Sequence, residues 1–471
     1  MKKMILFAMM LLGLTAFAQN SPPWVENPNH GLPATFGGGM DCAVLSANGD
    51  IGILQTGLTL YAPPDEWTGL TQLSIRDTSG NMTYLTGIFP NLGFSSAVFV
   101  DINNDGIQDI YISGAIDDNT YYAATYLGGP GNTYTLHQVL TGLVNSRVTF
   151  ADLDNNGWQD IIANGRDIND VFRTIIYKNT NGVLSEVTNH GIEGVEGGLG
   201  ILDYNNDGKK DIVVIASDGP SYVTKLYKSN GNFSFTSVPH NFEPTYESSI
   251  FVADFNSDGW DDVAYIGYNN GTYRFNVHLN MQNGTFSNPQ SYPGFAGGDI
   301  KGGDVDKDGH IDLVVSGARG NQALSTQLYM NDGTGHFVLK KSFQPGVAST
   351  SLVLFDLTGD TYLDFLFTGD ASTIPWSNAQ IRLYTNGTLD TQDFLADELK
   401  LWPNPVRDVL NIQAPTEIGS DLRVAMTDMS GRVIPIIMVN GQIDMSGLSS
   451  GIYLVTLTSQ GQSITKRVVK Q

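Results

Sequence analysis

Short apolar segments alternate with polar, glycine-rich segments along most of the chain, from residue 36 to residue 392. The apolar segments are rich in Val, Ile, Leu, Phe and Tyr, and they lack the periodic spacing of an amphipathic helix. The residues between them are mainly Gly, Asn, Asp and Ser, which favour tight turns. The pattern therefore predicts many short β-strands and an all-β fold.

One unit of this pattern recurs six times. It consists of an apolar strand, the loop D-x-[DN]-x-[DN]-G-x-x-D, a second apolar strand and usually a glycine. After each loop, a third strand runs into an Asn/Gly-rich hairpin turn that leads to a fourth strand. The loops start 50 to 52 residues apart, at Asp101, Asp152, Asp203, Asp254, Asp304 and Asp356.

An eroded seventh copy precedes these six. Aligning the closing glycines places its loop side chains at Val44, Ser46, Asn48 and Gly52, so this copy keeps the strand pattern without the carboxylates. Seven four-stranded units of about fifty residues describe a β-propeller, in which closure into a ring protects the sheet edges. A β-solenoid is the alternative, but its repeats are usually much shorter.

The repeated loops predict metal binding. Positions 1, 3, 5 and 9 place side-chain oxygens on one side of a tight turn, and the glycine at position 6 allows the chain to reverse with a positive φ. An all-oxygen set with several carboxylates suits Ca²⁺, a hard cation of flexible coordination. We expect about six structural Ca²⁺ ions, with ligands Asp101, Asn103, Asp105 and Asp109; Asp152, Asp154, Asn156 and Asp160; Asp203, Asn205, Asp207 and Asp211; Asp254, Asn256, Asp258 and Asp262; Asp304, Asp306, Asp308 and Asp312; and Asp356, Thr358, Asp360 and Asp364.

Three other interpretations of these loops are an EF-hand, Asx-turns without an ion, and a Mg²⁺ site. An EF-hand begins in the same way, but it needs a glutamate at position 12 and flanking helices, and none of the six loops has that glutamate. Asx-turns without an ion and Mg²⁺ in place of Ca²⁺ stay open. The loop from Asp356 departs most, because Thr358 replaces an acid or amide and Thr361 replaces the glycine. Six equivalent sites indicate stapled loops rather than a catalytic metal.

These repeats resemble the FG-GAP/VCBS repeat propellers, the fold also found in integrin α-subunit heads. The resemblance covers about residues 36–392 and is carried by a motif that stands in register six times. It implies a calcium-binding propeller.

The N-terminal end has the pattern of an export signal. M-K-K is followed by an apolar run over 4–14 and by the small residues of A-F-A before Gln19. This order is typical of a secretory signal peptide, which we place at 1–18, followed by an N-terminal linker at 19–35.

The C-terminal end differs in texture from the repeats. It contains L-W-P-N-P, D-M-S-G-R and L-S-S-G-I-Y, and it closes with the basic run K-R-V-V-K. Short strands between such turns predict a small β-sandwich. The motifs resemble the type A C-terminal sorting domain of the type IX secretion system of Bacteroidota, over about residues 396–471. The resemblance implies the type IX secretion machinery as a partner and a secreted or cell-surface protein.

The predicted fold class is thus all-β, a seven-bladed β-propeller with a C-terminal β-sandwich sorting domain. Composition narrows its partners. The chain has 48 Asp and Glu against 25 Lys and Arg, a net charge of −23. This excess of acid argues against nucleic acid and against an anionic membrane surface. No segment of the expected mature chain is apolar enough to span a membrane. The single cysteine, Cys42, excludes an intramolecular disulfide.

No catalytic motif stands out, so we expect a binding protein rather than an enzyme. The one G-x-S-x-G sequence, at 447–451, runs into a predicted strand instead of the helix that a nucleophile elbow needs. Arg166, Arg319 and Trp376 are the candidate ligand-binding residues, on loops of the face opposite the metal loops. Arg and aromatic side chains on loops are typical anchors for a glycan or a protein segment. The expected function is adhesion or ligand binding, and the alternative is an extracellular polysaccharide lyase or hydrolase built on the propeller.

Overall fold

A computed structural model describes most of the chain. The chain divides into two compact units, Met1–Thr385 and Asn386–Gln471. The predicted signal peptide at 1–18 lies outside the described residues. Within the described part, every regular element is a β-strand, which confirms the all-β prediction. The described residues are 24–28, 30–46, 49–62, 66–320, 323–372, 378–386, 400–413, 423–428, 432–436, 438–439, 441–459 and 462–471.

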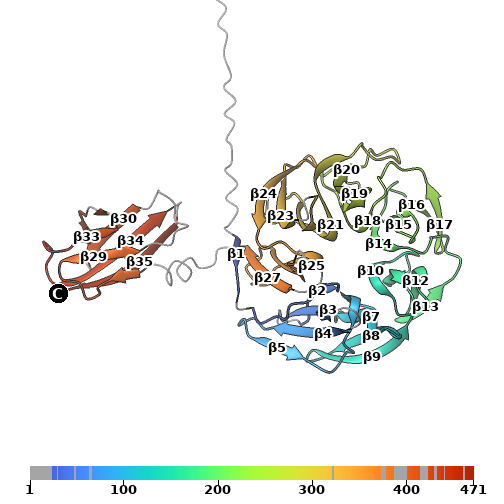
Figure 1. The fold of residues 1–471 in the computed structure, drawn as a ribbon, viewed down its shortest axis with the longest axis horizontal. Helices are drawn as coiled ribbons and strands as arrows, with labels where there is room; N and C mark the ends of the chain where they lie inside the picture. Colours follow the sequence, from blue (N-terminus) through green and yellow to red (C-terminus); the bar gives the residue numbers. More distant parts are fainter. Residues whose placement is uncertain are drawn as a thin grey trace, which may run out of the picture. The chain divides into compact units, whose positions relative to one another are not determined.

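The first unit is a ring of antiparallel sheets, and all but the closing sheet are formed by strands that follow one another in the chain (Figure 1). Four sheets are formed by four consecutive strands each. They are β2 (Met40–Val44), β3 (Ile51–Ala62), β4 (Glu66–Arg76) and β5 (Met82–Leu85); β6 (Gly93–Val100), β7 (Asp109–Asp117), β8 (Thr120–Gly129) and β9 (Thr133–Leu140); β10 (Val144–Ala151), β11 (Asp160–Arg166), β12 (Phe172–Thr180) and β13 (Val183–Val187); and β14 (Glu196–Leu202), β15 (Asp211–Ser217), β16 (Tyr222–Gly231) and β17 (Ser234–Val238).

The next sheet has seven strands because one long strand serves two repeats. Its strands are β18 (Tyr246–Ala253), β19 (Asp262–Asn269), β20 (Thr272–His278), β21 (Gln290–Gly303), β22 (Asp312–Ala318), β23 (Leu324–Asn331) and β24 (Phe337–Phe343). The first part of β21, up to Phe295, pairs with β20, and the rest pairs with β22. The strand changes partners next to Gly297, whose φ of 59° is easy for glycine alone.

The ring closes with strands from both ends of the first unit. β25 (Ala348–Phe355), β26 (Asp364–Asp370) and β27 (Ala379–Asn386) are joined by β1 (Trp24–Glu26) as the fourth strand. Trp24 is buried against Phe343 and Phe365, with a ring separation of 4.9 Å to the latter. Residues 19–35, which we expected to be a linker, therefore contain a strand that covers the edge of β27. With β21 counted in two sheets, the described strands of this unit form seven four-stranded blades.

The core lies between neighbouring blades. The second strand of each repeat is buried along most of its length, as in β7, where Ile110, Tyr111 and Ile112 have no exposed surface. Its side chains face a neighbouring blade on both sides, so successive residues are all apolar instead of alternating with polar ones. This packing explains why the sequence shows short continuous apolar runs. It also holds the loops between the first two strands at one end of each blade.

The second unit is formed by two four-stranded sheets that share one apolar core. One sheet holds β28 (Lys400–Trp402), β29 (Val409–Gln413), β33 (Gln442–Asp444) and β32 (Met438–Val439), and the other holds β31 (Val433–Ile434), β30 (Arg423–Asp428), β34 (Gly451–Ser459) and β35 (Gln462–Lys470). Leu410 and Ile443 from one sheet pack in the same cluster as Met426 and Val455 from the other. This arrangement is the predicted β-sandwich.

Candidate metal loops and central cavity

The six acidic loops fold as similar turns around their first aspartate. In the loop from Asp101, one carboxylate oxygen accepts the backbone N–H of Asp105 at 3.2 Å, and the other accepts that of Gly106 at 2.9 Å. The same pair of bonds recurs in the loops from Asp152, Asp203, Asp254, Asp304 and Asp356.

Position 6 of each loop has a positive φ, as the sequence predicted. Gly106 has a φ of 81°, and Thr361 has a φ of 75° in the loop from Asp356. A β-branched residue strains the backbone in this region, so this loop keeps the turn at a conformational cost.

The aspartate at position 9 anchors each loop to its own blade. In all six loops this side chain is fully buried. Asp160, for example, accepts the N–H of Leu153 at 2.8 Å with one oxygen and that of Asn179, on β12, at 2.7 Å with the other. Burial is the main cause that raises the pKa of this aspartate to about 6, and it raises the pKa of Asp312 to about 7. The position-9 carboxylate is therefore a structural bond as well as a candidate ligand.

Three buried asparagines connect the loop of one blade to the next blade. Asn331 donates through its side-chain amide to the carbonyl of Ile311 in its own repeat, at 3.1 Å, and to the carbonyl of Phe255 in the preceding repeat, at 2.8 Å. Asn179 and Asn280 make the corresponding bonds. Sequence analysis missed this role. The available signal was an asparagine two residues after the tyrosine or histidine of the third strand in these repeats.

Position 3 determines how many carboxylates a loop brings together. The ligand atoms of Asp152, Asp154 and Asp160 lie within 4.8 Å of one another. The ligand atoms of Asp304, Asp306 and Asp312 also lie within 4.8 Å of one another. Both oxygens of Asp306 and one oxygen of Asp154 are buried without a hydrogen-bond partner among the described residues. Such orphaned carboxylate oxygens fit a cation.

The loops with asparagine at position 3 are arranged differently. The side-chain amide of Asn103 donates to Asp105 at 2.9 Å, and Asn205 and Asn256 donate to their position-5 aspartates at 3.1 and 3.0 Å. These bonds satisfy part of the carboxylate, and an ion bound there would compete with the amide. The hydroxyl oxygen of Thr358, at position 3 of the last loop, is buried and unpartnered within the described part of the chain.

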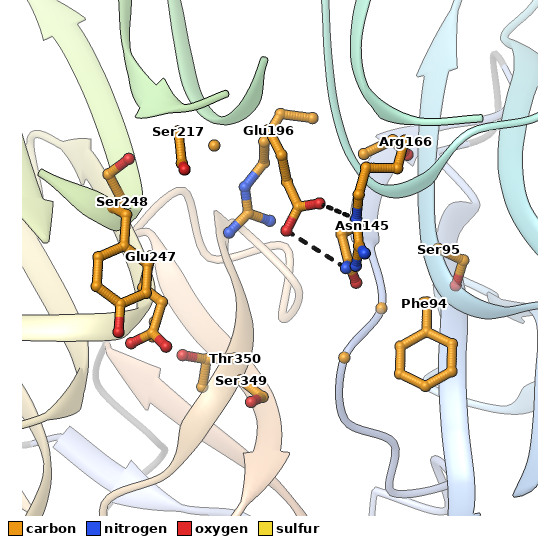
Figure 2. Close-up of a pocket in the computed structure, with 18 of the residues that line it drawn as sticks. Phe94, Ser95, Asn145, Arg166, Glu196, Ser217, Glu247, Ser248, Ser349 and Thr350 are labelled. Carbon is orange, nitrogen blue, oxygen red and sulfur yellow. Dashed lines mark hydrogen bonds and ion pairs between the residues drawn. The ribbon is translucent and has the colours of Figure 1, made fainter. Parts of the chain in front are cut away.

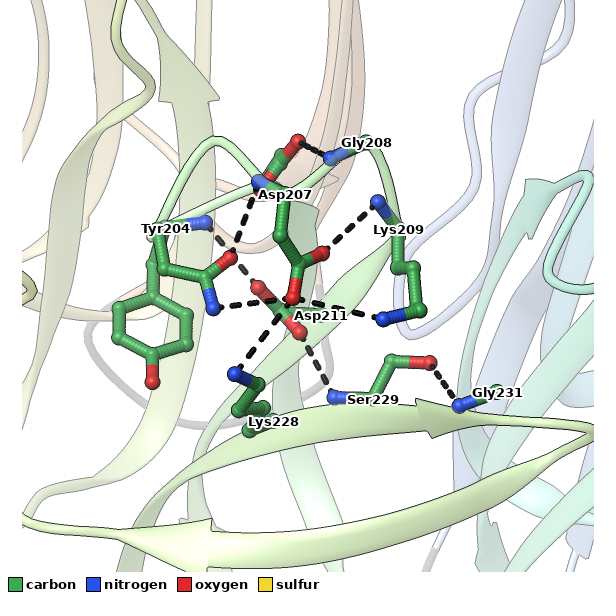
Figure 3. A network of polar contacts seen from close by, with 10 residues as sticks. Tyr204, Asp207, Gly208, Lys209, Asp211, Lys228, Ser229 and Gly231 are labelled. Atoms are coloured by element: carbon green, nitrogen blue, oxygen red, sulfur yellow. Dashed lines mark hydrogen bonds and ion pairs between the residues drawn. The ribbon is translucent and has the colours of Figure 1, made fainter.

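Lysine side chains reach two of the loops. In the loop from Asp203, Lys209 and Lys228 lie 3.6 and 3.5 Å from Asp207 (Figure 3). In the loop from Asp152, Lys178 lies 2.6 Å from Asp154. A bound cation would reduce the attraction between these lysines and the aspartates.

Two of the predicted ligand-binding residues, Arg166 and Arg319, line different cavities. Arg166 lines a cavity of about 430 Å³ at the mouth of the ring and contacts Glu196 at 2.6 Å (Figure 2). It also contacts Asp170 at 2.9 Å. Arg319 lines a different cavity, of about 420 Å³, and its guanidinium lies 5.4 Å from the ring centre of Phe295. Trp376 lies outside the described residues.

Two families match parts of the chain. Residues 400–471 match the secretion system C-terminal sorting domain. Residues 101–163, 203–265, 254–315 and 304–367 match the FG-GAP-like repeat. No curated protein matches the chain. Among the described residues, no helix has the length and hydropathy that a membrane span requires.

Several solved structures are similar at low identity. Rhamnogalacturonan lyase YesW is 13% identical, with 78% of this chain and 74% of that chain covered and a TM-score of 0.43. A lectin of Aleuria aurantia, AAL, is 12% identical, with 67% and 98% covered and a TM-score of 0.37. The hemagglutinin-neuraminidase ectodomain of parainfluenza virus 5 is 11% identical, with 78% and 85% covered and a TM-score of 0.33. At these values the similarity carries no argument about function.

Proposed function

We propose that this protein is a secreted or cell-surface, calcium-binding propeller that binds an extracellular glycan or protein. The proposal starts from its FG-GAP-like repeats and its secretion system C-terminal sorting domain. The sorting domain indicates export and implies contact with the secretion machinery. The calcium ions hold the loops of the blades, and the ligand binds at the opposite end of the ring.

The calcium proposal depends most on Asp306. Its two oxygens are buried without a side-chain partner among the described residues, and one of them lies within 4.8 Å of carboxylate oxygens of Asp304 and Asp312. Carboxylates at this distance repel one another unless a proton or a cation lies between them. The presence of Asp308 and Asp304 contributes, after burial, to raising the pKa of Asp306. Ca²⁺ would bind these oxygens and neutralise the cluster.

A structural role for the ions follows from what each loop is attached to. The loop joins the first two strands of a blade, its position-9 aspartate bonds to the third strand, and in three repeats an asparagine bonds to the preceding blade. An ion that holds the loop therefore also holds the contact between blades. The chain has one cysteine, so no intramolecular disulfide can replace this cross-link.

The calcium content of the purified full-length mature protein tests this proposal. After dialysis against Ca²⁺ and then against metal-free buffer, elemental analysis should find about six Ca²⁺ ions per chain, retained by the folded protein. A protein that keeps no Ca²⁺ after equilibration with excess ion would overturn the proposal. Retention of Mg²⁺ in place of Ca²⁺ from a mixture of both would overturn the choice of ion.

We also propose that the protein binds its ligand without chemical change. The support is the sequence, which contains no recognised catalytic motif, together with the ion pair of Arg166 with Glu196 in the central cavity. Incubation with plant, algal and bacterial polysaccharides should release no unsaturated or reducing products. Product formation that scales with the amount of purified protein would contradict this proposal and favour a lyase or a hydrolase.

A further inference from the structure

The cavity at the mouth of the ring is built from one repeated position. Six residues that line it each lie seven residues before the first residue of an acidic loop: Phe94, Asn145, Glu196, Glu247, Gly297 and Ser349. Figure 2 shows Glu247 on one side of the cavity and Asn145 and Phe94 on the other. The repeat therefore places a different side chain from each blade around a common space.

Four of these residues adopt a backbone conformation that favours glycine. The φ angles of Phe94, Asn145 and Glu247 are 49°, and that of Ser349 is 50°. Each residue lies at a bulge in the first strand of its blade, where the pairing register shifts. Bulges redirect side chains, and strained residues other than glycine gather at sites where the side chain is used. Gly297, at the same position in another blade, shows that the fold accepts glycine here.

Two opposite charges in the cavity have no partner. Arg166 and Glu196 neutralise each other at 2.6 Å. Within the described part of the chain, the carboxylate of Glu247 and the guanidinium of Arg147 make neither an ion pair nor a side-chain hydrogen bond, and both residues line the cavity. Glu247 is an exposed residue that lines the cavity, and the protein around it raises the pKa of its carboxyl by partial desolvation.

A buried hydroxyl group adds an independent sign of a missing partner. Thr350, which lines the same cavity, is 3% exposed, and its hydroxyl oxygen makes no hydrogen bond with any described residue. Buried polar atoms are nearly always hydrogen-bonded, to protein, water or ligand. The hydroxyl of Thr350 can both donate to and accept from a bound molecule.

The two free charges limit the class of ligand. Opposite charges give the cavity no net preference for a cation or an anion, because a ligand of one charge would meet one attraction and one repulsion. A neutral ligand rich in hydroxyl groups can donate to Glu247 and accept from Arg147 at the same time. The aromatic rings of Phe94 and Tyr246 offer apolar surfaces for the C–H faces of such a molecule. The cavity volume of about 430 Å³ lies within the range of small-molecule sites.

We propose that this cavity binds a neutral saccharide unit of a glycan, with Glu247 accepting and Arg147 donating hydrogen bonds to its hydroxyl groups. The inference rests on the proposed ligand-binding function and assigns it a site and a ligand class. It also places the site away from Arg319, which lines the other cavity.

Binding of the full-length mature protein to immobilised oligosaccharides, in excess Ca²⁺, tests the assignment. The panel holds neutral, uronate-containing and amino-sugar-containing oligosaccharides. We expect binding to neutral members, and a loss of about tenfold or more in affinity for Glu247→Gln and for Arg147→Gln, because each removes a charge-assisted hydrogen bond. Arg319→Gln is the matched control and should change the affinity by less than about twofold.

A glycine variant separates loss of binding from loss of folding. Glycine adopts the φ of 49° at position 247 without strain, so Glu247→Gly should leave the melting temperature unchanged or raise it, while binding is lost. Retained affinity in this variant would overturn the role of Glu247.

The other outcomes distinguish the failure of this inference from the failure of the proposed function. Binding that responds to Arg319→Gln but not to Glu247→Gln would overturn the site and leave ligand binding in place. Binding restricted to charged saccharides or to polypeptides would overturn the ligand class. If no glycan and no extracellular protein binds, the inference and the proposed ligand-binding function are both wrong.

Discussion

Aspartate at position 3 and aspartate at position 9 contribute differently to the acidic loops. The position-9 side chain is fully buried and has backbone partners in its own loop and on the third strand, so it stabilises the blade even without an ion. Asp306, at position 3, is half-buried, and both of its oxygens are buried without a side-chain partner within the described residues. An unpaired buried charge costs stability until a cation compensates it. An aspartate at position 3 therefore favours calcium binding but lowers the stability of the metal-free protein.

The variant Asp306→Asn tests whether this side chain has opposite effects on stability with and without Ca²⁺. Its amide can donate to Asp308, as Asn103 does to Asp105, and it removes one of three clustered negative charges. In excess EDTA we expect the variant to be as stable as the wild type or more stable, by up to about 1 kcal/mol. In excess Ca²⁺ we expect it to melt at a lower temperature than the wild type, because one ligand charge is lost.

Melting temperatures in both buffers provide the comparison. Asp332→Asn is the control, since Asp332 lies in a hairpin turn, accepts from Thr334 at 2.9 Å and should lose the same stability with and without Ca²⁺. If Asp306→Asn shifts the melting temperature equally in both buffers, Asp306 is not a calcium ligand.

His278 predicts a pH dependence that is independent of the metal loops. The side chain is fully buried next to Phe242 and Tyr265, and its Nδ1–H donates to the carbonyl of Ser287 at 2.9 Å. Burial lowers the pKa of His278 to about 4. In the unfolded chain the pKa is about 6.5, so the unfolded state binds more protons between these values. The stability that depends on neutral His278 is present above pH 6.5 and is lost as the pH falls toward 4.

The contribution of this histidine amounts to about 3 kcal/mol at most. Urea unfolding at pH 7 and at pH 5, in excess Ca²⁺, measures it as the difference between the wild type and His278→Gln. We expect the wild type to lose more stability than the variant on acidification, because glutamine does not titrate. Equal losses would show that His278 is not kept neutral by the fold.

At the scale of elements, the contact between blades depends on polar bonds as well as on apolar packing. The side chain of Asn331 bridges its own repeat and the carbonyl of Phe255 in the preceding one. Removing it leaves two buried carbonyl groups without a donor. Asn331→Ala should therefore lower the free energy of unfolding by about 2 kcal/mol.

Chemical denaturation in excess Ca²⁺ measures this effect. The control Asn119→Ala changes an exposed asparagine in a hairpin turn and should cost less than about 0.5 kcal/mol. A cost for Asn331→Ala as small as that of the control would show that the bridge between blades contributes nothing measurable.

Not all elements were accessible to sequence analysis. The strands with continuous apolar runs and the loops with regular spacing were predicted because both depend on residues close together in the chain. The strand β1 was not predicted, because Trp24–Glu26 is three residues long and its partner β27 lies at the other end of the first unit. Its burial depends on Phe343 and Phe365, which no local pattern connects to Trp24.

At the scale of the whole molecule, the central cavity could not be predicted either, because its residues are far apart in the sequence. Glu247 and Arg147 are 100 residues apart, and nothing in either neighbourhood indicates a shared cavity. Arg166 and Arg319 line different cavities, because residue type and loop position do not determine which side chains share a space, and Trp376 lies outside the described residues. The repeat register does contain the relevant signal, since the cavity residues lie seven positions before each acidic loop.

Net charge connects the loops to the stability of the whole molecule. The chain has a formal net charge of −23, and six Ca²⁺ ions would reduce it to about −11. Self-repulsion of a highly charged chain destabilises its compact state, so ion binding acts both within each loop and on the protein as a whole. The metal-free protein should accordingly be less stable than any single-loop variant in Ca²⁺.

The thermal unfolding of the full-length mature protein in excess Ca²⁺ and in excess EDTA, at the same pH and ionic strength, tests the central claim most directly. Six ions that bind only the folded state should raise the melting temperature by about 10 °C or more. We expect this difference to be restored when Ca²⁺ is added back to the chelated protein. Identical melting temperatures in the two buffers would contradict the account.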